Sequence, residues 1–356
     1  MINFQVVSLL GEDKSSNDES DSDSENEESG IPRYQITIFG RSADKKAICV
    51  KTNFNPYFFV EIPEGYTNSQ IAFMKTAFTK CLYKNAHHLK SASVVNRKKF
   101  YGFTNKEEFR FLRLVFFNHT AYKRVMYALR KPIRLANETR TFTAYEANMD
   151  PMLRFCHVTD VQTAGWLRIE KPKSCQFKET FCDEEYTCDW TRIKSDPNPT
   201  IAPLVQASFD IETYSYDGSF PDPKDEGCKC IQIATTLQRF GEPEAYKRQL
   251  LSLGTCNPIE GVEVVECKTE AELLNNWTKL IQEESVDILI GYNIWGFDLW
   301  YMITRAEMVN AEKFFQLGRY RDYQCVLRES SFSSSAYGHT DYKMVDTPGR
   351  FQLDLL

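Results

Sequence analysis

The sequence predicts an α/β fold with a mixed sheet over residues 201–356, preceded by an α+β domain over residues 1–195. Strand-like and helix-like segments alternate in the second part and mix irregularly in the first. Between them "KSDPNPTIAPL", residues 194–204, carries three prolines and no periodicity, which is typical of a linker. A chain of 356 residues also exceeds one ordinary hydrophobic core, which favours two domains.

The composition, 42% hydrophobic and 13% aromatic, fits a folded globular protein. No apolar run approaches the roughly 18 to 20 residues of a membrane span. The start, "MINFQVVSLLGEDK", lacks the basic segment and cleavage site of a secretory signal. We therefore expect an intracellular protein without a membrane segment.

The eleven cysteines include no CxxC pair. The closest pairs, Cys182 with Cys188 and Cys228 with Cys230, leave metal binding open. Reduced thiols packed as small apolar groups are the favoured interpretation.

The formal charge of −6 is unevenly distributed, because residues 12–28 hold nine carboxylates and one lysine. The rest of the chain is close to neutral, which permits a basic groove for nucleic acid but does not demonstrate one. Residues 12–28 offer no apolar side chain to bury, so we expect a disordered acidic insertion at the tip of a hairpin. A phosphorylated or partner-binding segment is the alternative.

In the first domain, branched and aromatic residues bounded by turn formers predict strands. An apolar residue at every third or fourth position predicts two helices. The strand segments are "INFQVVSLL", "RYQITIFG", "KAICVKTN" and "YFFVEIP", and the helices are "TNSQIAFMKTAFTKCLYK", with Ile71, Met74, Phe78 and Leu82 on one stripe, and "HTAYKRVMYALR", with Tyr122, Val125, Met126 and Leu129.

In the second domain the strand-like segments are "LVQASFDIETYS", "CIQIATTL" as its antiparallel neighbour, "VEVVECK" and "VDILIGYN". Thr269 followed by Glu272 predicts a capping box at the start of a helix. The unbroken apolar run of "VDILIGYN" is typical of a strand covered on both faces. A further helix is expected from about Phe297 to Val309.

Three carboxylates indicate the chemistry of this domain. The strand period of two places Asp210 and Glu212 on one face, where their charges repel each other and call for a cation, a shared proton or full solvation. Asp298 follows a buried strand and could face them across the sheet edge. A solvated edge pair, with Asn293 and Asp298 serving only a helix start, is the structural alternative.

The segments "FDIET" and "GYNIWGFDLWY" resemble the first and second exonuclease motifs of the B-family DNA polymerases, closest to the delta-type replicative catalytic subunits. The resemblance covers most of residues 200–356 and continues more weakly upstream, through "NPYFFVEIP" and "YEANMDPMLRF". It implies a ribonuclease H-like 3′–5′ exonuclease domain behind the N-terminal domain of a DNA-directed DNA polymerase, a nucleotidyltransferase of DNA replication.

The resemblance also implies roles for single residues. Asp210, Glu212 and Asp298 become ligands of two catalytic Mg²⁺ or Mn²⁺ ions, while Asn293, Phe297 and Tyr301 surround the 3′ end of the substrate strand. The implied reaction is two-metal hydrolysis that removes a mispaired 3′ nucleotide from a primer–template.

The family's third exonuclease motif, YxxxD on a helix, is expected beyond Leu356, as is the polymerase module. Tyr342 to Asp346 is a literal match, but Pro348 argues against a continuing helix, and we expect a chance match. Asp354 is expected beside the site. We therefore expect an N-terminal fragment with weak nuclease activity of its own.

The sequence leaves two alternatives to this function open. The first is a free-standing DEDD-type exonuclease, whose histidine version fails because His339 has Met344 where an acid is needed. The second is a non-catalytic nucleic-acid-binding remnant.

The first domain carries little chemistry. The rings of "FYGF" and "NPYFF" could stack on bases beside Lys98, Lys99, Lys123 and Arg124, but core packing is the favoured role for most of them. Sliding clamps and accessory replication subunits are the expected partners, through parts outside this chain. The nucleus, or the replication site of a large DNA virus, is the expected location.

Overall fold

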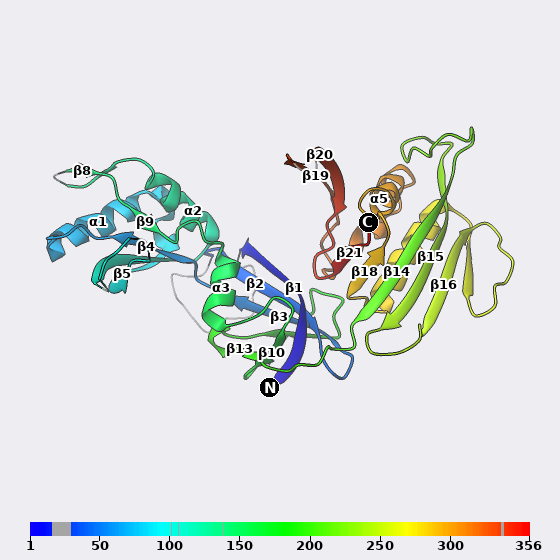
Figure 1. Ribbon diagram of the computed structural model, residues 1–356, viewed down its shortest axis with the longest axis horizontal. Coiled ribbons are helices and arrows are strands. Elements are labelled where there is room, and N and C mark those ends of the chain that lie inside the picture. The colour runs from blue at the N-terminus through cyan, green and yellow to red at the C-terminus, as the bar shows by residue number, and fades with distance from the viewer. Residues whose placement is uncertain (16–29, 101, 106, 137, 336–337) are drawn as a thin grey trace.

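The computed structural model describes residues 1–15, 30–100, 102–105, 107–136, 138–335 and 338–356. Strands from residues 2–196 form a seven-stranded and a four-stranded sheet, and strands from residues 205–354 form a six-stranded sheet (Figure 1). The proline-containing segment expected to be a linker runs between the seven-stranded and the six-stranded sheets.

The seven-stranded sheet of the described chain has the order β11-β12-β3-β2-β1-β10-β13. The phenylalanine and isoleucine side chains of β1, β2 and β10 form a core with α3. The elements are β1 (Ile2–Lys14), β2 (Arg33–Arg41), β3 (Ala47–Asn53), α3 (Pro151–Thr159), β10 (Trp166–Ile169), β11 (Lys173–Ser174), β12 (Glu184–Thr187), η2 (Trp190–Arg192) and β13 (Ile193–Asp196).

The β1–β2 hairpin is present, but β1 is longer than predicted. It continues to Lys14, which pairs with Arg33 across the hairpin, so residues 12–14 of the acidic run are ordered, contrary to our expectation. The Asp13 carboxylate accepts hydrogen bonds from the backbone N–H groups of His119 and Thr120 at 2.7 and 2.8 Å and so caps a helix. Residues 16–28 of the run lie outside the described residues.

The four-stranded sheet, ordered β5-β6-β4-β9 in the described residues, has two helices on one face. The predicted apolar stripe of the first helix is buried there, together with the inward side chains of β4 and β6. The elements are β4 (Tyr57–Glu61), α1 (Asn68–Lys80), η1 (Tyr83–His88), β5 (Leu89–Lys98), β6 (Glu108–Phe116), α2 (His119–Ala128), β7 (Ile133–Arg134), β8 (Thr139–Arg140) and β9 (Ala144–Tyr145). We name this part the basic lobe, residues 57–145.

The six-stranded sheet is mixed, as predicted, with the order β17-β16-β15-β14-β18-β21 in the described part of the chain. β14 is antiparallel to β15 and parallel to β18, which in turn is parallel to β21. β16 was missed by our prediction. The elements are β14 (Val205–Tyr214), β15 (Lys229–Arg239), β16 (Lys247–Leu253), β17 (Glu263–Cys267), α4 (Glu270–Glu283), β18 (Ile288–Gly291), α5 (Asp298–Met308), η3 (Glu312–Gln316), β19 (Leu327–Ser334), β20 (Gly338–Val345) and β21 (Phe351–Asp354).

Helices α4 and α5 cover the buried side of this sheet, where Trp277 of α4 packs against Phe209 of β14 with ring centroids 4.9 Å apart. Thr269 caps α4 as predicted, by accepting a hydrogen bond from the Glu272 N–H. The reciprocal half of the capping box is different, because the Glu272 carboxylate accepts from the Lys268 N–H instead.

A buried cluster of charges joins the seven-stranded sheet to the six-stranded sheet. Asp287, fully buried just before β18, accepts from Arg41 Nε at 2.7 Å and from Arg319 Nη2 at 2.6 Å. Its Oδ2 also accepts from the Val205 N–H at 2.8 Å, at the start of β14. We call Arg41, Asp287 and Arg319 the Asp287 cluster.

Backbone pairing reinforces the junction. Thr180 and Tyr320 form an isolated antiparallel bridge, and the Phe181 N–H donates to the Arg319 carbonyl at 2.8 Å. The Tyr320 ring meets Phe39 of β2 edge to face, with centroids 5.4 Å apart. The two sheets are therefore held together by an apolar, a backbone and an ionic contact at once.

All eleven cysteines are free thiols, which agrees with the favoured interpretation of the sequence. Among the described residues, no helix has the length and apolar content to cross a membrane.

Asp287→Asn should strongly destabilise the fold, because it leaves two buried guanidinium groups without a balancing charge. Removing one partner of a buried pair costs about 3–5 kcal/mol. Glu283→Gln, which breaks the exposed pair with Lys279, is the matched control and should cost less than about 1 kcal/mol. Denaturant midpoints measure both variants, and equal midpoints would contradict the role of the cluster.

Candidate active site

Asp210 and Glu212 lie on the exposed side of β14, as the strand period predicts. Phe209 and Ile211, between and beside them, point into the core. Two carboxylates are thus fixed on one face of a central strand whose other face is packed.

The neighbouring strand β18 ends early, which opens the sheet beside these carboxylates. β18 pairs with β14 only as far as Ser208 and stops at Gly291. A Cβ atom at Gly291 would lie 2.4 Å from the Ile294 side chain and 2.9 Å from the Phe209 carbonyl oxygen. Glycine therefore allows the chain to turn sharply away from β14 at this point.

The turn that follows is held by Asp354, at the end of β21. One carboxylate oxygen accepts from the Asn293 N–H at 2.7 Å, and the other accepts from the Trp295 N–H at 3.0 Å. Asn293 has a left-handed backbone with φ of 59°, which asparagine tolerates better than most residues. Asp354 thus shapes the turn with both of its oxygens and lies beside the site, as expected.

Asp298 is the first residue of α5 and is only 3% exposed. Its Oδ1 accepts a hydrogen bond from the Ile211 N–H at 3.2 Å, at a level of β14 that β18 no longer reaches. Burial, followed by the negative charge of Asp210, raises the pKa of Asp298 to about 7. The structure therefore brings the predicted Asp298 within electrostatic range of Asp210.

The donor set of this site fits a hard divalent cation, since it consists of carboxylate oxygens. Burial, and after it the negative charge of Asp210, raises the pKa of Asp298, and a bound cation would offset both effects by favouring the ionised form. No three His, Cys, Asp or Glu side chains of the described residues converge at metal-ligand spacing. The carboxylates share one location without forming a closed cage.

The three residues matched to the 3′ end of a substrate differ in exposure. Asn293 and Phe297 are half-buried, whereas Tyr301 is fully buried. The Tyr301 hydroxyl has no hydrogen-bond partner among the described residues, and burial raises its pKa well above the ordinary value. Phe220, from the loop after β14, meets the Phe297 ring edge to face at 5.4 Å. Phe220 was not predicted from the sequence, because no motif identifies it.

A buried ion pair supports the helix that carries Asp298. Arg305 of α5 donates to both carboxylate oxygens of Glu270 at 2.8 and 2.7 Å and also to the backbone carbonyls of Pro223 and Asp225. These bonds tie the loop after β14 to both helices.

The literal YxxxD match is not part of this site. Tyr342 lies on β20, a strand, and the Asp346 carboxylate accepts from the Tyr323 hydroxyl and from Arg328, each at 2.6 Å. The interpretation as a chance match agrees with this geometry.

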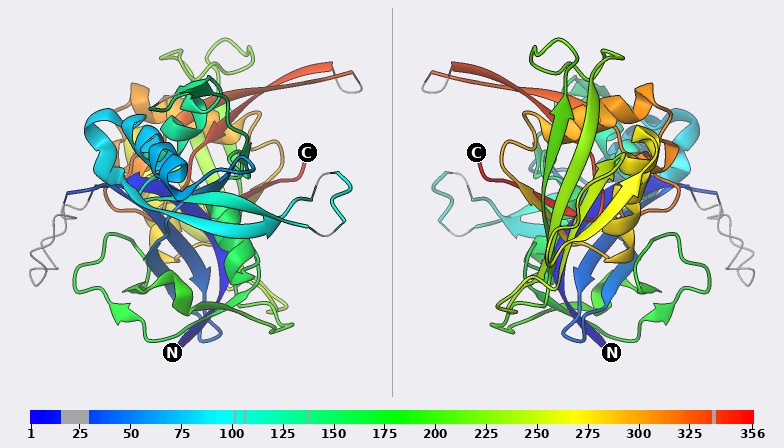
Figure 2. Two further views of the ribbon diagram at one scale, coloured as in Figure 1. Left: turned by 90° about the vertical axis from the view of Figure 1, so that its left-hand side faces the viewer. Right: turned by 90° about the vertical axis from the view of Figure 1, so that its right-hand side faces the viewer.

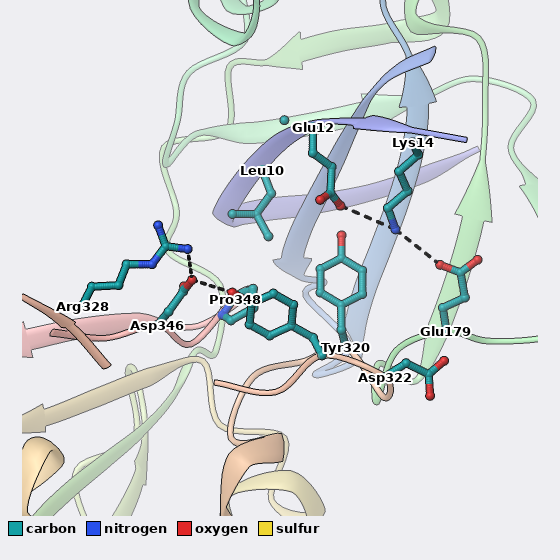
Figure 3. Close-up of a pocket in the computed structure, with 11 residues that line it drawn as sticks. Leu10, Glu12, Lys14, Glu179, Tyr320, Asp322, Arg328, Asp346 and Pro348 are labelled. Carbon is teal, nitrogen blue, oxygen red and sulfur yellow. Dashed lines mark hydrogen bonds and ion pairs between the residues drawn. The ribbon is translucent and has the colours of Figure 1, made fainter. Parts of the chain in front are cut away.

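A cavity of about 420 Å³ lies elsewhere, between β1 and the segments that contain Tyr320 and Pro348 (Figure 3). Lys14 lies 3.5 Å from Glu12 and 3.8 Å from Glu179 along its wall. Asp210, Glu212 and Asp298 do not line it. The carboxylate site therefore lies apart from this cavity.

The aromatic residues of the basic lobe only partly follow our expectation. Phe58, from "NPYFF", is buried, as expected. Phe100 and Phe103, from "FYGF", are almost fully exposed, which contradicts core packing for these two rings. Lys99 is paired with Glu61 at 2.6 Å.

The chain is similar to known DNA polymerases. Residues 142–356 match the family described as DNA polymerase family B, exonuclease domain. The chain is 31% identical over 334 residues to a DNA polymerase of Paramecium bursaria Chlorella virus NY2A, covering 92% of this chain and 35% of that protein. It is 35% identical over 290 residues to a DNA polymerase of Acanthamoeba polyphaga mimivirus, covering 77% of this chain and 17% of the relative.

A cellular relative and a solved structure to which the chain is similar are also DNA polymerases. The DNA polymerase delta catalytic subunit of Bos taurus is 32% identical over 338 residues, 90% of this chain and 30% of the relative. The chain thus spans about a third or less of these curated relatives. The family B DNA polymerase of the archaeon Pyrobaculum calidifontis shares the fold, with a TM-score of 0.63 at 15% identity over 99% of this chain and 36% of that one. The six-stranded domain is ribonuclease H-like, and the protein belongs to family B of the DNA polymerases.

Proposed function

We propose that residues 201–356 form a 3′–5′ exonuclease domain that hydrolyses the terminal phosphodiester bond of a DNA strand, within a replicative DNA-directed DNA polymerase, and that residues 1–195 form its N-terminal domain. The observation that supports the proposal is that the buried Asp298 bonds to the backbone of Ile211 and lies within electrostatic range of Asp210, in a chain that matches the family-B exonuclease domain.

Each proposed site residue has a task that follows from its position. Asp210 and Glu212 are exposed and can bind cations directly, whereas Asp298 approaches from the buried side at the start of α5. Phe297, with Phe220 at its edge, provides an aromatic surface for the terminal base of the strand. We assign Asn293 and Tyr301 to the same end of the substrate, Tyr301 through its unpartnered hydroxyl.

Asp210, Glu212 and Asp298 would hold two divalent cations, Mg²⁺ or Mn²⁺. Bound there, these ions lower the pKa of the attacking water and stabilise charge on the leaving 3′ oxygen. A mispaired 3′ end separates more easily from its template than a paired one, and this favours its entry into the site, which makes proofreading the proposed purpose.

The proposed substrate is the single-stranded 3′ end of a primer–template. The relatives come from viruses and from a mammal, so we propose that the protein acts at a nuclear or viral site of DNA replication. A sliding clamp and accessory replication subunits are proposed partners of the whole polymerase.

Mn²⁺ binding should depend on Asp210 and Glu212. In calorimetric titration the full chain should show heat of Mn²⁺ binding. The double variant Asp210→Asn with Glu212→Gln should show none, because both exposed ligands lose their charge. Any Mg²⁺-dependent shortening of a 5′-labelled single strand should proceed from its 3′ end and fall by at least about a hundredfold in the double variant.

Glu260→Gln with Glu312→Gln, at two exposed carboxylates elsewhere in the same domain, is the matched control and should bind Mn²⁺ like the unchanged chain. Absence of Mn²⁺ binding that depends on Asp210 and Glu212 would favour a non-catalytic nucleic-acid-binding domain instead.

Asp298→Asn should stabilise the metal-free protein at high pH. The pKa of Asp298 is raised to about 7 in the folded state from an ordinary value of 3.8, so its ionised form opposes folding. That cost is absent below the ordinary pKa, grows as the pH rises toward 7 and is complete above it. In EDTA at about pH 8 the variant should gain on the order of 2 kcal/mol, a gain that disappears toward about pH 4.

Added Mn²⁺ should reverse the order, because the unchanged chain gains stability from the bound ion and the variant gains less. Thermal melting at both pH values, with and without Mn²⁺, measures these effects. A variant less stable than the unchanged chain in EDTA at high pH would show that the Asp298 carboxylate is not strained by its surroundings.

A further inference from the structure

The basic lobe concentrates positive charge that the net charge of the chain conceals. Residues 65–137 contain fifteen lysines and arginines but two carboxylates, a net charge of +13, while the whole chain is at −6. These residues form α1, η1, β5, β6, α2 and β7, at the end of the molecule opposite the six-stranded sheet (Figure 1). A potential of one sign on one lobe attracts a polyanion.

These cations are mostly not neutralised within the protein. Among the described lysines and arginines of residues 65–137, Lys99 forms an ion pair with a carboxylate, that of Glu61, and the others form none. Several guanidinium groups instead lie over aromatic rings, as Arg124 does over Tyr83 at 4.9 Å and Arg130 over Tyr127 at 4.6 Å. Their charges therefore remain available to a ligand.

One surface of the lobe combines this charge with a hollow. Tyr83, Lys84, Asn85 and Arg124 line a cavity of about 320 Å³ between the start of η1 and helix α2. Tyr83 is 74% exposed although Arg124 covers one side of its ring, so the ring is open to a ligand. We call these four residues the Tyr83 site. An open ring beside two cations suits a flat ligand that carries negative charge.

The backbone at this site is unusual. Tyr83 has φ of 51°, in the left-handed region that a bulky aromatic residue rarely adopts. The preceding Leu82 is fully buried in the core of the lobe, so the chain is anchored there and then directs Tyr83 outward. Core packing does not explain an exposed aromatic ring held in this way.

We propose that the Tyr83 site binds single-stranded nucleic acid. A base stacks on the open side of the Tyr83 ring, while Lys84 and Arg124 contact the flanking phosphates and the Asn85 amide lies within the same hollow. Aromatic rings that interleave with cations bind single strands in this way, and every base offers a face for stacking. A duplex fits less well, because its bases are already stacked on one another.

The Tyr83 site is separate from the carboxylate site, because the basic lobe and the strand β14 lie at opposite ends of the molecule (Figure 1). In Figure 2 the lobe faces the viewer on the left, and the six-stranded sheet faces the viewer on the right. The proposal does not depend on nuclease activity. A strand held here is a second segment of nucleic acid, bound without a metal ion.

The test is fluorescence anisotropy of a labelled oligo(dT), titrated with the full chain in EDTA so that no hydrolysis takes place. Tyr83→Ala should weaken binding roughly fivefold to a hundredfold, as expected for the loss of one stacked base, and Tyr83→Phe should bind like the unchanged chain. Melting temperatures verify that each variant is folded.

Lys84→Glu with Arg124→Glu should weaken binding further and lower the slope of log affinity against log salt by about 1.4, since each phosphate contact on a single strand contributes about 0.7. Lys279→Glu with Lys313→Glu is the control, because it makes the same charge change at exposed residues of the six-stranded domain. Equal losses in the two double variants would mean that net charge alone drives binding and would overturn the proposal.

Two further arms identify the ligand. Oligo(U) in place of oligo(dT) tests whether the site prefers DNA or RNA, and either preference is compatible with the proposal. A polyglutamate peptide that competes as well as the oligonucleotide, at equal charge, would overturn it, because a peptide acid has no base to stack. So would an unchanged affinity of folded Tyr83→Ala.

Discussion

The buried carboxylate of Asp287 is the contact on which the arrangement of this protein depends. It binds Arg41 from the seven-stranded sheet and Arg319 from the segment before β19, and it accepts the N–H of Val205 where β14 begins. The backbone of Asp287 also bonds to Val205 and to Phe351, at the starts of β14 and β21. One residue therefore aligns three parallel strands at one end. Because β14 is longer than β18 and β21, it extends beyond them at the other end, and the candidate active site lies there.

At the staggered ends, two neighbouring carboxylates have opposite environments. Asp354 accepts two backbone N–H groups and stabilises a turn, which is the ordinary structural use of an aspartate. Asp298 accepts one N–H group, is buried and faces the negative charge of Asp210, and its pKa rises as a result. The fold thus satisfies one carboxylate and leaves the other strained, which is the arrangement expected where a group serves a cation and not stability.

The molecule also separates charge over a long distance. The carboxylates of Asp210, Glu212 and Asp298 lie on β14 and at the start of α5, and the cations of residues 65–137 lie in the basic lobe. A polyanionic strand is attracted to the lobe directly, whereas at the carboxylates its phosphates need intervening metal ions. Under the two proposals, the two ends hold the same kind of polymer by different physical means, one independent of metal ions and the other dependent on them. The Asp287 cluster bonds the seven-stranded sheet, to which the lobe is joined, to the six-stranded sheet.

The sequence by itself determined the features that depend on local periodicity and on short motifs. The alternation along "SFDIET" placed Asp210 and Glu212 on one exposed face, the stripes of α1 and α2 identified their buried sides, and the motif around Asp298 indicated the family. Only the tertiary structure decided which charges meet. Arg41 and Asp287 are 246 positions apart, and nothing in their neighbours predicts the pair. The same holds for Phe220 on Phe297, for the burial of Tyr301, for the role of Asp13 as a helix cap and for Arg124 over Tyr83. The physical reason is that periodicity is imposed by neighbours along the chain, whereas desolvation and pairing are imposed by residues that only the complete fold brings together.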